Sequence, residues 1–259
     1  AVAPDGITAK YTGALIQSGR CSPRGSIDIT RQAKKRGVNL TREVTVHHLP
    51  VTDEACADYK AATRVNPPLR SADHVEAMRA AVLDGTVDAI VTDHSPHAPE
   101  EKDVEFRYAP NGFCGLETSL AVMLTDLYHT NVFDLKTIIS KMSCEPAKLF
   151  KLAGGTLKEG SVADITIMDL NKEWTVDSSK FYTRGKFTPY EGKACKGKAV
   201  ATMLHGNFAQ ERYGSGGTRV NLDYIYMLVT NDVLNVDHAL NLEAQSHLVG
   251  VFNDGADNA

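Results

Sequence analysis

The sequence predicts an α/β fold in which the last strands of an α/β barrel are followed by a small β-sandwich module. The first half of the 259-residue chain alternates helix-like and strand-like segments, and the region after Gly154 is mainly strand-like. The short run at 87–92 is mostly apolar, as in a parallel strand that is covered on both faces by helices. This order of elements favours a barrel piece followed by a sandwich.

The first elements are marked by a cap and by β-branched residues. Ser26 is expected to cap a helix that reaches about Arg36, and residues 38–46 predict a strand that ends at His47. The buried positions of that helix should be Ile27, Ile29 and Ala33. The first 20 or so residues give only weak signals.

A second helix should run from about Asp73 to Asp84 after a cap at Ser71, and the strand at 87–92 should present Asp93 at its carboxyl end. The apolar stripe of this helix is Val75, Met78 and Val82. Three further helices are predicted at 116–128, 135–142 and 146–152.

Strand signals dominate the back of the chain. Residues 162–169 and 174–176 predict two strands, and residues 199–208 predict a hairpin that turns near His205. We therefore expect a partial barrel at 1–153, a small β-sandwich module at 154–212, and a linker with an unassigned tail at 213–259.

Composition narrows the class of protein. The formal net charge is −4, no block of five like charges occurs, and no apolar run approaches the length of a membrane span, so neither nucleic acid nor a membrane is an expected partner. The five cysteines are scattered, which argues against a disulfide framework and a cysteine-rich zinc site. The first ten residues do not resemble a signal peptide, and a cytoplasmic protein is expected.

The segment Thr92-Asp93-His94-Ser95-Pro96-His97 is the richest in chemical groups. Barrel enzymes keep catalytic groups at the carboxyl ends of their strands, and a carboxylate there can bind a cation or move a proton. The alternative is an aspartate that caps a turn beside surface histidines. Two histidines, a proline and an aspartate in six residues favour a functional site.

Two loops could supply ligand contacts. Asn66 precedes two prolines that fix an extended backbone, and Asn111-Gly112 begins a glycine-containing approach to a helix. Each loop alone is more often a simple connector or turn. His47 and His48 are adjacent, so at most one of them should point into a barrel mouth, and a structural role or support of a metal ligand is favoured over direct ligation.

Together these segments resemble the class I dihydroorotase family. The matching stretches occur in family order over 25–211, and the most specific are EVTVHHL at 43–49, VNPPLR at 65–70, DGTVDAIVTDHSPH at 84–97 and GLET at 115–118. Allantoinases and hydantoinases share the barrel, but the NPPLR and GLET motifs favour dihydroorotase. The stretches at 155–164 and 187–192 continue the match.

The resemblance implies a metal-dependent (β/α)₈ barrel, with strands seven and eight at about 44–47 and 87–92, that interconverts N-carbamoyl-L-aspartate and L-dihydroorotate in pyrimidine synthesis. By position, Asp93 is implied to be a zinc ligand and the catalytic acid/base group at a site that usually holds two Zn²⁺ ions. Asn66 and His97 are implied to bind the substrate's ring and carboxylate, with Asn111 and Gly112 contacting the ring through backbone atoms. His47 is implied to support the metal ligands.

The chain departs from the family at the metal site. The family uses a His-x-His pair on strand one, a Lys or Asp on strand four, and histidines on strands five and six. No His-x-His occurs here, and the strand-six position falls on Arg20, whose guanidinium has no free lone pair. A full barrel takes about 250 residues, so the front of the barrel is expected to be absent.

Three interpretations remain: a partial dihydroorotase, a catalytically inactive relative that acts as a scaffold for aspartate transcarbamoylase, or another amidohydrolase such as an allantoinase. The open edges of a partial barrel predict a homo-oligomer or a protein partner.

Overall fold

The structure contains a parallel sheet of three strands where the sequence predicted the last strands of a barrel. The computed structural model describes residues 2–211, 225–227 and 234–235. Strands β1 (Ile16–Ser18), β2 (Leu40–Thr45) and β3 (Ala89–Val91) are all parallel and lie in the order β1-β2-β3. Because parallel strands end at the same edge, the loops that follow them share one side of the sheet.

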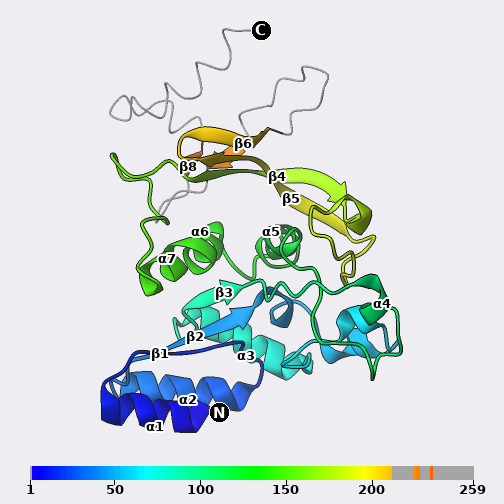
Figure 1. Ribbon diagram of the computed structural model, residues 1–259. Coiled ribbons are helices and arrows are strands. Elements are labelled where there is room, and N and C mark those ends of the chain that lie inside the picture. The colour runs from blue at the N-terminus through cyan, green and yellow to red at the C-terminus, as the bar shows by residue number, and fades with distance from the viewer. Residues whose placement is uncertain (1, 212–224, 228–233, 236–259) are drawn as a thin grey trace.

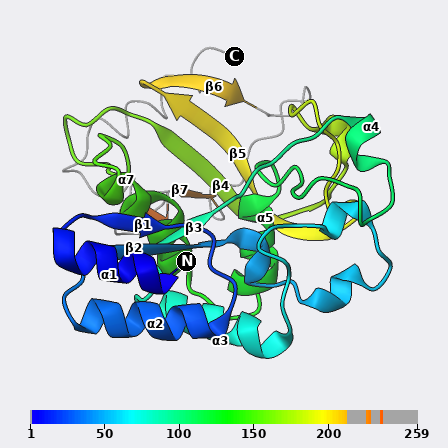
Figure 2. The same ribbon diagram turned by 60° about the horizontal axis from the view of Figure 1, so that its bottom comes forward.

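Helices cover this sheet, as Figure 1 shows. Helices α1 (Val2–Thr12), α2 (Arg24–Lys35) and α3 (Ala72–Leu83) lie on one side of it. Helices α5 (Ser119–Met123), α6 (Leu135–Ile139) and α7 (Glu145–Leu149) lie between it and a second sheet, and the short helix α4 (Pro99–Lys102) lies apart from them. Figure 2 shows the same layers from below.

The second sheet is antiparallel, in the order β6-β5-β4-β7-β8. Its strands are β4 (Ile165–Thr175), β5 (Ala194–Leu204), β6 (Asn207–Glu211), β7 (Ile225–Met227) and β8 (Leu234–Asn235). The hairpin predicted near His205 is confirmed, since His205 and Gly206 take positive φ between β5 and β6. The described residues of this region form one antiparallel sheet, so the sandwich stays a prediction.

Two strands that were predicted separately in this region form a single strand in the structure. Residues 162–169 and 174–176 were expected to be separate, but β4 continues through both, with a register shift between Asp169 and Glu173. This register shift accommodates the residues that interrupt the alternation of apolar and polar side chains along β4. Apart from β7 and β8, the predicted tail at 213–259 lies outside the described residues.

The start of the chain is more regular than its sequence predicts. Helix α1 and strand β1 fall where only weak signals were seen, so the structure has a third parallel strand. Helix α2 begins at Arg24 with Pro23 at its N-cap, three residues before the expected cap at Ser26. The expected burial of Ile27 is confirmed, but that of Ile29 is wrong because 42% of its surface is exposed.

Helices α3 and α5 differ in how well their patterns predict them. The apolar stripe of α3 is buried as expected, and Ser71 occupies its N-cap, although its hydroxyl bonds Asp73 instead of a backbone N–H. The helix expected at 116–128 begins only at Ser119 and continues as a π-helical turn, Leu124–Tyr128. Leu116 therefore precedes the helix, and 56% of its surface is exposed.

The two helices expected at 135–142 and 146–152 form one continuous helical run. Helix α6 passes through a π-helical turn, Ser140–Cys144, directly into α7, which ends at Leu149. Pro146 has no N–H to offer an α-helical ladder, and the wider π turn before it tolerates that loss. Short 3-10 turns complete the chain at Val46–His48, Asp53–Cys56, Ala61–Thr63 and Ser178–Lys180.

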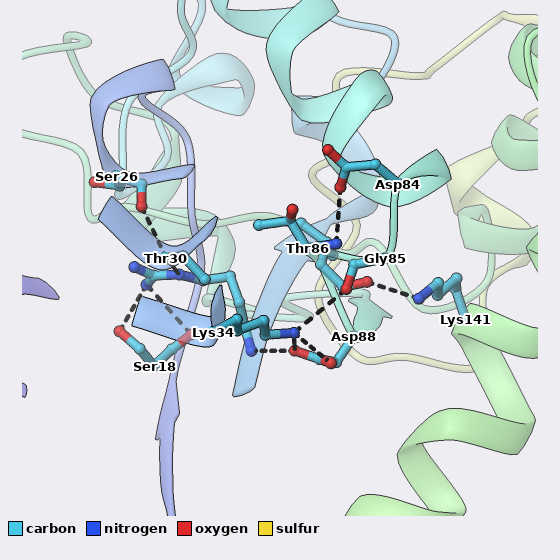
Figure 3. A network of polar contacts seen from close by, with 11 residues as sticks. Ser18, Ser26, Thr30, Lys34, Asp84, Gly85, Thr86, Asp88 and Lys141 are labelled. Carbon is cyan, nitrogen blue, oxygen red and sulfur yellow. Dashed lines mark hydrogen bonds and ion pairs between the residues drawn. The ribbon is translucent and has the colours of Figure 1, made fainter. Parts of the chain in front are cut away.

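A polar network holds α2 against the amino-terminal side of β3. Figure 3 shows Lys34 of α2 facing Asp88, whose two carboxylate oxygens lie 2.7 and 2.6 Å from its Nζ. Arg42 of β2 is buried, donates from Nε to Thr30 and from NH1 to Ser18, and donates its backbone N–H to Asp88. This network fixes the packing of α2 on the sheet at the edge opposite Asp93.

All five cysteines are free thiols. No helix in the described ranges combines the length and the apolar character that a membrane span needs.

Candidate functional site

Two charged residues meet at the carboxyl edge of the parallel sheet. Asp93 follows β3 and Arg20 follows β1, and Arg20 NH1 donates to Asp93 Oδ1 at 3.1 Å. Both residues have positive φ, which turns the backbone sharply at the ends of their strands. The strand between them, β2, holds Arg20 in place because Glu43 accepts its backbone N–H.

The environment of Asp93 suits a carboxyl group that exchanges protons. Its side chain is 11% exposed, whereas that of Arg20 is 49% exposed. Burial raises the pKa of Asp93 above its usual range, and the Arg20 guanidinium opposes part of that increase. The position expected to hold a zinc ligand is therefore a carboxylate paired with a protein cation.

The expected loop around Asn66 is held by His48, one of the two adjacent histidines for which the sequence favoured a structural role or support of a metal ligand. His48 Nε2 donates to the carbonyl oxygens of Pro67 and Pro68, both at 3.2 Å, and its Nδ1 lies 2.6 Å from Thr45 Oγ1. A neutral imidazole fits this arrangement, with one donor and one acceptor nitrogen. Asn66 itself is exposed and free to meet a ligand.

A second group of hydrogen-bonded residues contains His97, Asn111 and Gly112. His97 Nε2 donates to the Asn111 carbonyl at 3.0 Å, and Arg64 Nε donates to Asn111 Oδ1 at 3.1 Å. The Gly112 N–H donates to the Arg64 carbonyl at 2.8 Å. The structure thus brings together three of the four predicted substrate residues and places them beside the start of the loop that holds the fourth, Asn66.

Close packing explains why residue 112 is glycine. Its φ is +112°, and a Cβ added there would collide with the Ser95 side chain. The Ser95 N–H donates to the Phe113 carbonyl, so the loop after Asp93 runs directly alongside the Asn111 loop. Hydrogen bonds therefore link all three predicted segments, although no hydrogen bond or ion pair joins Asp93 to Asn66 or His97 in the described structure.

His47 lies in the 3-10 turn after β2 and is buried, with 2% of its surface exposed. Its ring packs against His48 and Phe113, with centroids 4.5 and 5.1 Å away, and neither nitrogen has a hydrogen-bond partner among the described residues. Burial, and then His48, lower the pKa of His47 well below its usual range. Its expected role in supporting metal ligands stays a prediction.

The described residues do not form a zinc site. No group of three or more His, Cys, Asp or Glu side chains in the described part of the chain is arranged to hold a metal ion. The one expected ligand, Asp93, bonds a guanidinium, which cannot ligate zinc. A zinc site needs about three protein ligands, so this donor set does not fit the ion.

Glu117 of the GLET motif has a structural role. It accepts hydrogen bonds from the backbone N–H groups of Tyr182 and Thr183 and from the Thr183 hydroxyl. These bonds hold the segment after residue 180 against the start of α5.

Comparison with known proteins defines the class. The model of the Amidohydrolase family matches residues 9–209, and the chain belongs to that family. The fold agrees: L-hydantoinase from Arthrobacter aurescens superposes with a TM-score of 0.78 at 30% identity, covering 82% of this chain and 48% of that one. D-hydantoinase from Thermus sp. superposes with a TM-score of 0.72 at 24% identity, which shows the fold alone.

Within the family, the similar curated sequences include dihydroorotases. The chain is 48% identical to the dihydroorotase of Citrifermentans bemidjiense over 206 residues, which cover 80% of this chain and 48% of that protein. It is 44% identical to the dihydroorotase of Syntrophus aciditrophicus over 210 residues, 81% of this chain and 49% of that protein. The chain spans about half the length of these relatives.

Proposed function

We propose that this chain is the substrate-binding part of a dihydroorotase that interconverts N-carbamoyl-L-aspartate and L-dihydroorotate. The observation that carries the proposal is 48% identity to a curated dihydroorotase over 80% of the chain. The linked loops of Asn66, His97 and Asn111 support it, because amide and imidazole groups can bind a cyclic amide and its carboxylate.

In the proposed site, Asn66 and His97 bind the ring and the carboxylate, and the loop at Asn111-Gly112 packs against the ring. Asp93 is proposed to hold or release a proton, since burial raises its pKa. His47 is proposed to support residues at the sheet edge. In this proposal 1–153 is the partial barrel, 154–212 is the sandwich module and 213–259 is a linker and tail.

Zinc is proposed only for a complete barrel. The family resemblance implies two Zn²⁺ ions per site, but the described residues supply Asp93 alone and pair it with Arg20. Any further ligands must come from outside the described residues. We therefore assign no zinc-dependent step to this chain.

The test is hydrolysis of dihydroorotate by the purified chain with added zinc, beside an Asp93→Asn variant. Turnover that disappears in Asp93→Asn supports the proposal for this chain. Parallel binding measurements with dihydroorotate, allantoin and a hydantoin distinguish it from another amidohydrolase. Binding of allantoin or the hydantoin without binding of dihydroorotate would contradict the assigned substrate.

A second candidate is a catalytically inactive scaffold for aspartate transcarbamoylase. The Arg20–Asp93 ion pair favours it, because a cation of the protein already neutralises the carboxylate. Co-sedimentation with aspartate transcarbamoylase, together with absence of turnover, is the outcome expected of a scaffold.

The parallel sheet also favours association. Among the described strands, β1 and β3 are its two edges, and unpaired edges tend to pair with other chains. A homo-oligomer or a partner-bound form is proposed, and a single monomeric species in analytical ultracentrifugation would contradict it. A cytoplasmic location is proposed from the five free thiols.

A further inference from the structure

The most buried cation of the described structure lies beside the proposed substrate loop. Lys102, the last residue of α4, is 1% exposed, whereas lysine is almost never fully buried without partners. Its Nζ donates to the carbonyl oxygens of Ala61, Pro110 and Gly112 at 2.8, 2.9 and 2.8 Å. An ammonium group has three donors, so these three bonds satisfy it completely.

Two of the three carbonyls that accept hydrogen bonds from Lys102 belong to the residues next to Asn111. Pro110 and Gly112 stand on either side of Asn111, so Lys102 holds the carbonyl group before that of Asn111 and the carbonyl group after it. The carbonyl between them, that of Asn111, accepts from His97 Nε2 at 3.0 Å. Three consecutive carbonyls are therefore held alternately by Lys102, His97 and Lys102.

Helix α4 connects His97 and Lys102 along the chain. His97 precedes the helix and Lys102 ends it, and the Glu101 side chain accepts the Ala98 N–H at 3.1 Å. His97 Nδ1 lies 3.7 Å from Glu101 Oε2. A shift of the Lys102 ammonium would therefore move both the carbonyl that accepts from His97 and the helix that follows His97.

We propose that Lys102 is a positioning residue: its ammonium holds the carbonyls on both sides of Asn111 and thereby sets the hydrogen bond between Asn111 and His97. It touches no substrate in this arrangement. The consequence for substrate binding rests on the proposed function, but the effect on His97 does not.

The lowered pKa of Lys102 allows its role to be tested by a change of pH. Burial lowers the pKa of Lys102 to about 8, the guanidinium of Arg64 acts in the same direction, and the Cys114 thiol opposes them. Wild-type protein can thus be brought from an ammonium to a neutral amine by raising the pH from about 7 to about 9.5.

The test compares Lys102→Met with Lys141→Met. Lys141 is a matched control because its Nζ also donates to a buried backbone carbonyl, that of Val87 at 2.7 Å, away from the Asn111 loop. The readout is the ¹⁵N spectrum of the His97 imidazole, assigned by its disappearance in His97→Gln. Wild-type His97 should show the Nε2–H tautomer that its bond to Asn111 requires.

Lys102→Met should lose the Nε2–H signature of His97, while Lys141→Met should keep it. A folded Lys102→Met protein with unchanged His97 signals would overturn the proposal. If Lys102→Met does not fold, the wild-type titration decides: His97 signals that move as Lys102 loses its proton support the proposal, and signals that stay fixed contradict it.

A binding measurement separates this inference from the proposed function. If dihydroorotate binds the wild-type chain, Lys102→Met should bind it about tenfold more weakly, the effect of one lost hydrogen bond. Equal affinity of the two proteins would overturn the positioning role toward substrate. Absence of binding by the wild type would contradict the proposed function, while the His97 spectrum would still decide the role of Lys102.

Discussion

Lowering the pH should destabilise this protein through His48. Burial lowers its pKa from about 6.5 to about 4, although the Pro67 and Pro68 carbonyls partly oppose that change. The unfolded chain therefore binds a proton on this residue before the folded chain does. The stability that the neutral imidazole contributes is present above about pH 6.5 and is lost as the pH falls toward 4.

The size of the effect follows from the two pKa values. One pKa unit between them is equivalent to about 1.4 kcal/mol, so the difference of about 2.5 units is equivalent to about 3 kcal/mol. At pH 5, about 1.5 units below the unfolded value, about 2 kcal/mol should be lost. His48 is only 2% exposed, so solvent screens this effect little.

The assay is urea unfolding of the wild type and His48→Gln at about pH 7 and pH 5. Glutamine does not titrate but can still donate to the Pro67 carbonyl, so the variant should lose about 2 kcal/mol less than the wild type over that range. His205→Asn is the control, because this exposed histidine lies in a turn with positive φ, where asparagine is tolerated. Equal losses in wild type and His48→Gln would refute the reasoning.

Three further predictions concern the sheet edge and the Asn111 loop. Arg20→Met should raise the pKa of Asp93, because the guanidinium lowers it; ¹³C NMR of the carboxyl group measures this, and an unchanged pKa would contradict the ion pair. Gly112→Ala should cost about 2 kcal/mol or more by thermal unfolding, whereas Gly206→Ala, which has positive φ but nothing within 4 Å of the new Cβ, should cost less. The pKa of Lys102 is lowered to about 8, so the unfolded chain holds a proton on this residue between about pH 8 and pH 10.5 that the folded chain has lost. The free energy of unfolding of the wild type, measured in urea, should therefore rise relative to that of Lys102→Met over this pH range. The same pH dependence in both proteins would contradict the prediction.

The Arg20–Asp93 ion pair would compete with a metal ion for the Asp93 carboxylate. A guanidinium 3.1 Å from the carboxylate neutralises much of its charge without a metal. Added zinc would have to displace Arg20 and find further ligands outside the described residues. Metal-binding experiments on this chain therefore measure a competition, and Arg20→Met is the variant in which that competition is removed.

Local patterns in the sequence determined the elements whose side chains repeat regularly. The stripe of Val75, Met78 and Val82 predicted α3 to within a residue at each end, and the apolar run before Asp93 located β3. The motifs also placed Asn66, His97 and Asn111 in loops near the sheet edge. Each of these signals depends on neighbouring residues, which is why it can be read from the chain alone.

Only the tertiary structure decided which of those residues meet. Strand β1 has three residues and is held by pairing with β2, so its own sequence could not identify it. The bonds from His48 to the Pro67-Pro68 loop, and from Lys102 to Ala61 and to the carbonyls around Asn111, join residues that are 8 to 41 positions apart. Burial makes such partners obligatory, and no local pattern encodes which distant carbonyl a buried donor will find.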